Sequence, residues 1–374
     1  MLKQYHIKHY NFRLVIYVVA LTMIGISVIG SAQESVQDKQ IAGLLIGLVA
    51  MLTVSLIDYS FILRFNWLIY AFNLGMLGLI TFHILGGDAR GGAVRWIEVA
   101  GFRFQPSELS KVLLILFFAW FFGKFHEKIN TLPVIVASGV LIFIPWFMVE
   151  NQPDLSTSIV IAVIFLSLLF LGGLSYKIIL GVLAVVIPAA ALFIYLILQP
   201  DQKILEDYQW IRIMSWLQPE KYAENVFQQK NSIMAIGSGQ LWGKGLNNDT
   251  VFSVKNGNFI PEPQTDFIFA VAGEELGFVG SAIILALLLL IVIECILMGR
   301  RAKDLSGQLI CGGVAVWIGF QTFVNICVVT GMMPNTGLTL PFVSYGLTSL
   351  VSLFIGIGLV LNVGLQPLKY RMEG

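Results

Sequence analysis

The sequence predicts an all-α, polytopic membrane protein with ten transmembrane helices, and its composition carries most of that prediction. Apolar residues make up 57% of the 374 residues, and charged residues make up only 12%. Soluble domains hold roughly 25% charged residues, so this chain has about half of the usual share. Its mean hydropathy is +0.83. A surface with so few charges must face lipid over most of its area.

The same composition excludes several classes of function. A net charge of +1 excludes a nucleic-acid-binding protein that relies on a basic face. The three cysteines all lie in apolar stretches and form no CxxC pair, so neither a disulfide framework nor a zinc site is indicated. The four histidines are scattered along the chain. We therefore assign no residues as metal ligands.

Ten apolar runs are long enough to cross a hydrocarbon layer about 30 Å thick as helices. The first follows a short basic segment and resembles a signal peptide, but nine further spans favour an uncleaved helix. The ten runs lie at 13–32, 40–57, 65–85, 107–123, 132–149, 156–173, 177–198, 266–298, 307–330 and 345–366.

The distribution of lysine and arginine predicts the orientation of these spans. If the N-terminus is cytoplasmic, twelve Lys and Arg residues fall on inner segments and five on the short outer segments. Cytoplasmic loops carry the excess of positive charge, so both termini are expected inside. The chain is then a single membrane domain, 1–374, with a large extracytoplasmic loop at 199–265. Most of the acidic residues fall on the outer side, where we expect the polar chemistry.

The long outer loop contains two recognisable stretches. Residues 207–217 are apolar on much of a helical circumference and include Trp210 and Trp216, so a helix in the membrane interface is expected. Residues 237–245 are rich in glycine but lack the first glycine and the final Ser/Thr of a phosphate-binding P-loop. A turn is the favoured interpretation of this second stretch.

The eighth span begins with an unusual cluster of acidic residues. Pro261 and Pro263 stop the loop from continuing as helix, and Thr265 is a good cap. Asp266 then falls in the first turn at the outer surface, where it either complements the helix dipole or has a function, and the helix N-terminus is expected to lower its pKa. Glu274 and its neighbour follow about 12 Å further along a straight helix, inside hydrocarbon. Charges at that depth favour a helix that lines a polar cavity.

Two other loops place charged residues at the outer ends of spans. Ser107 is expected to cap the fourth span, with Glu108 and Lys111 on one face of it. These two form either a simple ion pair or a site for an anionic lipid headgroup. Asp154 either caps the sixth span or takes part in the same chemistry.

Before the last span, 334–346 is apolar and broken by Pro and Gly, which favours a re-entrant stretch buried in protein.

Five motifs stand in a fixed order along the chain, and together they resemble the SEDS family, the RodA, FtsW and SpoVE proteins of bacterial shape, division and sporulation. One departure is Gly-Leu-Thr-Ser at 346–349, where the family usually reads Gly-Gly-Ser-Ser. The stretch 341–345 resembles the RodA, or elongation, branch. The motifs are RWI (95–97), FQPSE (104–108), NQPDL (151–155), TDFIF (265–269) with EELG (274–277), and LPFVSYG (340–346).

This resemblance implies a function, a partner and a location. The function is a peptidoglycan glycosyltransferase that polymerises lipid II on the outer face of the bacterial cytoplasmic membrane. The partner is a class B penicillin-binding protein, a transpeptidase. The essential aspartate of the family falls on Asp266, which becomes the catalytic residue. The substrate-binding residues it implies are Arg95, Trp96, Glu108, Lys111, Gln152, Asp154, Glu274 and Ser344.

The chemistry of that reaction agrees with the residues. A sugar hydroxyl that attacks the donor needs a carboxylate base within reach, and the departing pyrophosphate needs positive charge. Lys111, Arg95 or a divalent cation (Mg or Mn) would supply that charge. A lipid II flippase would need polar residues at every depth, yet only Glu294 lies toward the inner end of its span. A non-catalytic scaffold would not need buried carboxylates at 274–275, so the enzyme is favoured.

Overall fold

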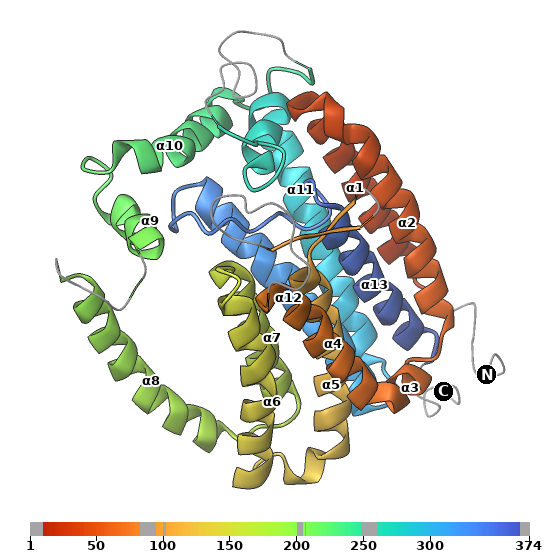
Figure 1. The fold of residues 1–374 in the computed structure, drawn as a ribbon. Helices are drawn as coiled ribbons and strands as arrows, with labels where there is room; N and C mark the ends of the chain where they lie inside the picture. Colours follow the sequence, from red (N-terminus) through yellow and green to blue (C-terminus); the bar gives the residue numbers. More distant parts are fainter. Residues whose placement is uncertain are drawn as a thin grey trace.

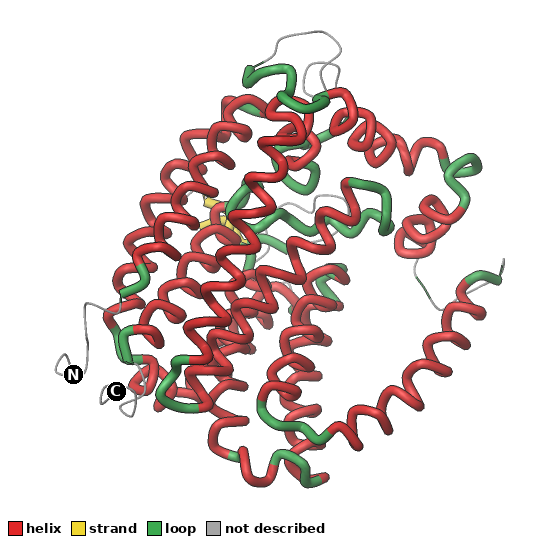
Figure 2. Tube along the Cα trace, turned by 180° about the vertical axis from the view of Figure 1, so that it is seen from behind, coloured by secondary structure: helices red, strands yellow, loops and turns green. Residues whose placement is uncertain are grey.

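The computed structural model describes residues 10–82, 95–99, 102–199, 205, 207–247 and 260–366. Within these ranges nearly all of the regular structure is helical, and the two short strands are the exception (Figure 2). The strands pair in antiparallel fashion, with Ile97 opposite Phe104. The elements are α1 (Phe12–Ala32), α2 (Gln37–Leu56), α3 (Tyr59–Ile62), α4 (Asn66–Thr81), β1 (Ile97–Val99), β2 (Phe102–Phe104), α5 (Pro106–Lys124), α6 (Leu132–Glu150), α7 (Leu155–Leu171), α8 (Tyr176–Ile197), α9 (Asp207–Leu217), α10 (Ala223–Ser238), α11 (Ile268–Arg300), α12 (Leu305–Val329) and α13 (Leu347–Gly364).

The predicted spans are confirmed one by one. Nine segments of the described chain are helical, apolar and long enough to cross a membrane, and α7, with 17 residues, is a shorter apolar helix. Each of the ten predicted runs coincides with one of these helices. The largest difference is in the third run, which was expected to reach 85, whereas α4 ends at Thr81. The prediction of an all-α polytopic membrane protein is therefore correct.

The bundle has a compact centre and one helix that stands apart. In the centre α13 packs on α2, α11 packs on α1 and α12, and α12 packs on α5 and α7. Large side chains such as Trp317, Phe117 and Phe354 are fully buried there. By contrast, α8 is apolar all round and has only Ile197 buried, and it projects away from the other helices (Figure 1). A helix that is apolar and exposed in this way is suited to face lipid.

Side-chain contacts place the beginning and the end of the described chain at one end of the bundle. Asn11 Nδ2, before α1, donates to the carboxylate of Glu294 near the end of α11 at 2.6 Å. Lys303, which follows α11, donates to Gln366 after α13. Gln366 also bonds Asp58 at 3.2 Å. An even number of spans requires this arrangement, and it agrees with two termini on the cytoplasmic side. Helices α9 and α10 lie at the opposite end (Figure 1).

The expected depth of Glu274 and Glu275 is wrong. Helix α11 is broken at Gly277, whose φ of 66° and ψ of −162° are not helical. Glu275 accepts a hydrogen bond from Ser31, which lies one residue before the outer end of α1. The two carboxylates thus lie level with the outer end of a span and are buried in protein. A straight helix from 266 would place both residues inside hydrocarbon, but Gly277 separates the helical piece that carries them from the rest of α11.

Candidate functional site

Asp266 lies just outside α11, in a turn that covers the outer end of the bundle. The N-cap position of α11 is Phe267, which makes no side-chain capping bond. The hydroxyl of Thr265 donates instead to the carbonyl of Glu262 at 2.9 Å. The predicted Thr265 cap and the placement of Asp266 in the first helical turn are therefore wrong, because 262–267 forms a turn of its own. The carboxylate of Asp266 is half-buried.

The backbone around Asp266 is held by two distant elements. Asn325 Nδ2, on α12, donates to the carbonyl of Asp266 at 2.8 Å and to that of Leu338 at 2.6 Å. Ser344 Oγ donates to the carbonyl of Thr265 at 2.7 Å. The amide of Tyr345 donates to the carbonyl of Gln264 at 2.9 Å. These bonds fix the place from which the carboxylate extends.

The segment 334–346 is the non-helical, protein-buried stretch that the sequence predicts. Its apolar residues Leu340, Phe342 and Val343 are almost fully buried. Gly337 has a φ of +78°, and a Cβ added there would lie 3.3 Å from Asp266 Oδ2. A glycine at this position lets the backbone of the segment lie directly against the carboxylate of Asp266.

Charges of both signs lie around Asp266, and burial has the largest effect on its pKa. Burial raises the pKa of Asp266 from its ordinary 3.8 to about 6; among the charges, Arg212 and Arg95 lower the pKa, and Glu262 and Asp154 raise it. The sequence predicted a lowered pKa from the helix N-terminus, and this is wrong because the residue is buried ahead of the helix. A carboxyl that titrates near neutral pH is well matched to accept a proton.

Arg95 attaches the β1–β2 hairpin to the turn between α6 and α7. Its Nε donates to the carbonyl of Gln152 at 3.1 Å, and its Nη2 donates to that of Pro153. Gln152 is itself buried, and its Nε2 donates to the hydroxyl of Thr81 at 3.1 Å. Trp96 is half-buried beside Arg95 at the start of the hairpin. The charge of Arg95 therefore acts on Asp266 from a position fixed by backbone carbonyls.

Asp154 caps α7, which is one of the two roles that the sequence left open, and it also accepts hydrogen bonds from residues at the start of α5. Its Oδ1 accepts from the amide of Thr157 at 3.3 Å and so caps α7. Its Oδ2 accepts from Gln105 Nε2 at 3.1 Å and from Ser107 Oγ at 3.3 Å. Ser107 does not cap α5 as predicted, because the N-cap position is Gln105 and Pro106 is the first helical residue. Asp154 thus joins the start of α5 to the start of α7.

Glu108 and Lys111 form the predicted ion pair, and it is deeply buried. Lys111 Nζ lies 2.8 Å from Glu108 Oε1, and the side chains are 0% and 7% exposed. Nζ also donates to Gln321 Oε1 at 3.2 Å. Gln321 Nε2 in turn donates to the carbonyl of Thr339, in 334–346, at 2.9 Å. The pair is therefore linked to the segment that lies against Asp266.

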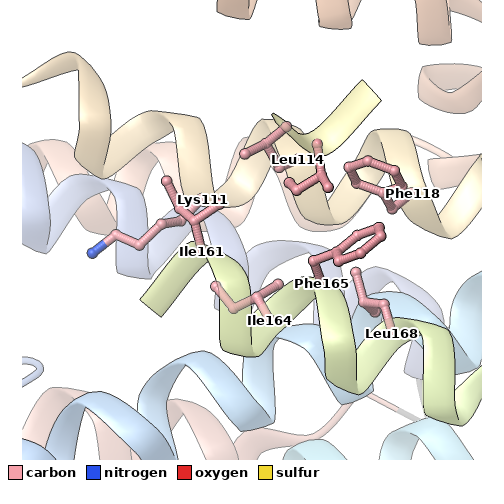
Figure 3. Close-up of a pocket in the computed structure, with 8 residues that line it drawn as sticks. Lys111, Leu114, Phe118, Ile161, Ile164, Phe165 and Leu168 are labelled. Carbon is pink, nitrogen blue, oxygen red and sulfur yellow. The ribbon is translucent and has the colours of Figure 1, made fainter. Parts of the chain in front are cut away.

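The stem and the charged end of Lys111 lie in different surroundings. The stem lines a narrow apolar pocket between α5, α6 and α7, while Nζ points away from the rings of Phe118 and Phe165 (Figure 3) and lies 5.0 Å from the centroid of the Trp317 ring. Long cationic side chains commonly divide their stem and head in this way. The pocket is apolar, so the polar part of the site lies on the ammonium side of Lys111. The pocket is lined by Lys111, Leu114, Phe118, Ile142, Ile161, Ile164, Phe165 and Leu168.

Most of the predicted site residues come together, but Glu274 does not join them. Its Oε1 pairs with Lys244 Nζ, from the loop after α10, at 2.6 Å. Arg212, Gln321 and Asn325 are the residues that sequence reasoning missed. Two signals could have found them. Arg212 is the cation of an amphipathic interfacial helix, and the two amides lie four residues apart in an apolar span, where polar side chains are rare.

The described residues do not bring together three His, Cys, Asp or Glu side chains that could hold a metal ion. The divalent cation considered from the sequence stays a prediction, because Mg²⁺ commonly binds through only one or two carboxylates together with substrate phosphates. The positive charge near Asp266 comes from arginine side chains of this chain, Arg212 and Arg95.

Comparison with known proteins gives one consistent family. The model of the FtsW/RodA/SpoVE family, described as cell cycle protein, matches residues 5–367. A probable peptidoglycan glycosyltransferase FtsW from Geobacter metallireducens is 32% identical over 98% of this chain and 96% of its own. The peptidoglycan glycosyltransferase MrdB of Escherichia coli K12 is 34% identical over 95% of this chain and 93% of its own.

Solved structures agree with the sequence comparisons. A chain from a peptidoglycan synthase complex, described as coordinating polymerization and crosslinking, superposes with a TM-score of 0.75 and 27% identity. The match covers 95% of this chain and 97% of that one. The rod shape determining protein RodA of Thermus thermophilus superposes with a TM-score of 0.67 and 26% identity, over 95% and 96% of the two chains.

Proposed function

The chain belongs to the FtsW/RodA/SpoVE family of cell cycle proteins, and we propose that it polymerises lipid II with Asp266 as the catalytic base. The chain is similar over nearly its whole length to relatives named as peptidoglycan glycosyltransferases, and this is the activity of the chain. The apolar helices make it a multi-pass protein of the cytoplasmic membrane. Three points are proposals: lipid II as the substrate, Asp266 as the base, and a class B penicillin-binding protein as the partner.

The observation that carries the proposal is the position of the Asp266 carboxylate. It is half-buried at the outer end of the bundle, its backbone is fixed by Asn325 and Ser344, and its pKa is about 6. At neutral pH most Asp266 carboxyls are then ionised, and each can accept a proton from a sugar hydroxyl. That hydroxyl attacks the anomeric carbon of the donor sugar. The bond to the pyrophosphate breaks, and the pyrophosphate leaves with the electron pair.

The departing pyrophosphate requires positive charge close to Asp266. Arg212 is exposed and Arg95 is half-buried, and both act on the Asp266 carboxyl. Lys111 is 0% exposed and is already engaged with Glu108 and Gln321. This burial favours the two arginines as direct contacts for pyrophosphate. Lys111 then acts through Gln321 on the segment 334–346.

We propose a class B penicillin-binding protein, a transpeptidase, as the partner. The support is a solved relative that works within a peptidoglycan synthase complex of polymerization and crosslinking. The product of this chain, an uncrosslinked glycan strand, is the substrate that a crosslinking enzyme needs. The polyprenyl tails of donor and product stay in lipid, so polymerisation is confined to the membrane edge where Asp266 lies.

The test is polymerisation by the purified chain in liposomes that contain lipid II and no other glycosyltransferase. Glycan strands of many disaccharides should appear on a gel. Asp38→Asn changes an exposed acid in the first turn of α2. It is the matched control for Asp266→Asn and should polymerise like the parent. A flippase would move lipid II between leaflets without forming strands, and a scaffold would do neither. Either of these results would contradict the proposal.

A further inference from the structure

The loop segment 239–247, which follows α10, is inserted into α11 at the point where that helix is broken. Four backbone hydrogen bonds cross between the loop and the helix. In an unbroken helix the amides of 278 and 279 would bond to the carbonyls of 274 and 275. Here each of these four groups bonds to the loop instead. The bonds run from Lys244 N to Glu274 O (2.9 Å), Gly245 N to Glu275 O (3.0 Å), Phe278 N to Gln240 O (2.8 Å) and Val279 N to Leu241 O (3.1 Å).

Glycines make this close approach possible. A Cβ on Gly243 would lie 2.1 Å from the carbonyl oxygen of Glu275, and a Cβ on Gly239 would lie 1.9 Å from that of Gly273. No side chain fits at these separations. The glycine-rich composition of 237–245, which the sequence assigned only to a turn, therefore serves the contact between two backbones.

One ion pair closes the insertion. Lys244 Nζ lies 2.6 Å from Glu274 Oε1, and the side chains are 28% and 3% exposed. A buried carboxylate needs such a partner, because an isolated charge in this position is strongly unfavourable. The pair stands one residue from Gly245 on the loop and three residues from Gly277 on the helix, so it joins the loop to the helical piece just before the break.

We propose that Lys244 is a positioning residue for glycosyl transfer, which acts by fixing the piece of α11 that leads to Asp266. The proposal rests on the proposed role of Asp266 as the base. Residues 268–276 form a short helical piece between Asp266 and the break at Gly277. Asn325 and Ser344 fix the Asp266 end of this piece. The loop, closed by Lys244, fixes the other end.

The expected effect follows from the sensitivity of catalysis to geometry. A displacement of a catalytic group by about 1 Å can lower a rate by roughly 100-fold. Lys244 pairs with Glu274, at the end of the helical piece away from Asp266, so its loss should leave the binding of lipid II intact. We therefore expect a change in kcat and little change in KM.

The first experiment compares Lys244→Met with Lys244→Arg in the full chain, with lipid II in liposomes. Lys244→Met keeps the stem and removes the charge, and kcat should fall by about 10- to 100-fold with KM within about twofold. Lys244→Arg keeps the ion pair and should stay within about threefold of the parent. Lys230→Met, at an exposed lysine of α10, is the matched control and should leave kcat unchanged.

The second experiment separates the insertion from the charge. Gly243→Ala places its Cβ into the carbonyl of Glu275 and should lower kcat as Lys244→Met does. Gly245→Ala is the control, since Gly245 also has a positive φ, of 94°, but a Cβ there meets nothing within 4 Å. Hydrogen exchange at the amides of Phe278 and Val279 should become faster in Lys244→Met and Gly243→Ala only.

The outcomes distinguish this proposal from the function on which it rests. If Asp266→Asn polymerises like the parent, the role of Asp266 is wrong, and the positioning of that residue is wrong with it. If Asp266→Asn is inactive while Lys244→Met keeps its kcat, only the positioning role is overturned. An increase in KM at constant kcat, or a Lys244→Arg variant as slow as Lys244→Met, also overturns it.

Discussion

At the scale of single residues, the environment of Asp266 decides what its carboxyl can do. The sequence could predict the residue, because its motif and its place before an outer helix end were visible. It could not predict the burial, because the contacts come from Asn325 and Gly337, about 60 to 70 positions away. Long-range packing of this kind leaves no local pattern. The predicted sign of the pKa shift was wrong for that reason.

The raised pKa predicts an acidic limb in the rate of polymerisation. The base works only when Asp266 is ionised, so kcat/KM should fall as the pH drops, with a midpoint near the pKa of about 6. An ordinary aspartate would place that midpoint near 3.8. The measurement is the initial rate at low lipid II concentration from pH 5 to pH 8. A flat profile over this range would contradict the assignment.

The buried pair of Glu108 and Lys111 predicts an effect on stability that depends on removing one partner or both. Lys111→Met leaves a buried carboxylate without its cation, which should destabilise the protein by about 3 kcal/mol. The double variant Glu108→Gln/Lys111→Met removes both charges and should recover at least half of that loss. Thermal unfolding in detergent measures both. A double variant less stable than Lys111→Met would mean that the pair does not act as a buried ion pair.

At the scale of elements, the sequence predicts well which helices exist and predicts poorly where a helix is broken or how it is capped. Apolar runs of the right length gave every span, and the Pro- and Gly-broken pattern gave the re-entrant segment 334–346. The break of α11 at Gly277 was not predicted, because a single glycine in an apolar helix is common. The break depends on bonds from 240–245, which are tertiary. The same holds for Ser107, which bonds Asp154 on another helix instead of capping its own.

The position of Gly337 predicts a strong effect of a single methyl group. In Gly337→Ala the new Cβ lies 3.3 Å from Asp266 Oδ2 at a φ of +78°, so it presses on the carboxylate and strains the backbone. We expect kcat to fall at least about tenfold, because the base is displaced. Gly331→Ala is the matched control, since its φ is +79° and its Cβ meets Ile233 instead. Equal loss in both variants would assign the effect to backbone strain alone.

At the scale of the whole molecule, an even number of spans and one long outer loop place the turn that carries Asp266 and the two ends of the described chain at opposite ends of the bundle. The charge count predicted this arrangement, and the contacts of Asn11 and Gln366 agree with it. The position of α8 apart from the bundle was not predictable from the sequence. An apolar run is compatible with packing against lipid and with packing against protein, and it does not distinguish the two.

The topology predicts which residues a membrane-impermeant thiol reagent can reach. All three native cysteines are buried, so the background should be low. Lys230→Cys, exposed on α10, should be labelled in intact spheroplasts. Lys128→Cys, exposed between α5 and α6, should be labelled only after permeabilisation. The reverse pattern would invert the proposed orientation and place Asp266 on the cytoplasmic side.

The central claim is that Asp266 is the base for glycan polymerisation, and the most direct test is the kcat of purified Asp266→Asn on lipid II. We expect kcat to fall by roughly 100- to 10,000-fold while lipid II binding is kept. Unfolding should occur at or above the temperature of the parent at pH 8, because a carboxyl with a raised pKa destabilises the fold increasingly between pH 3.8 and about 6, and fully above that. A folded Asp266→Asn variant that polymerises within a few-fold of the parent would contradict the claim.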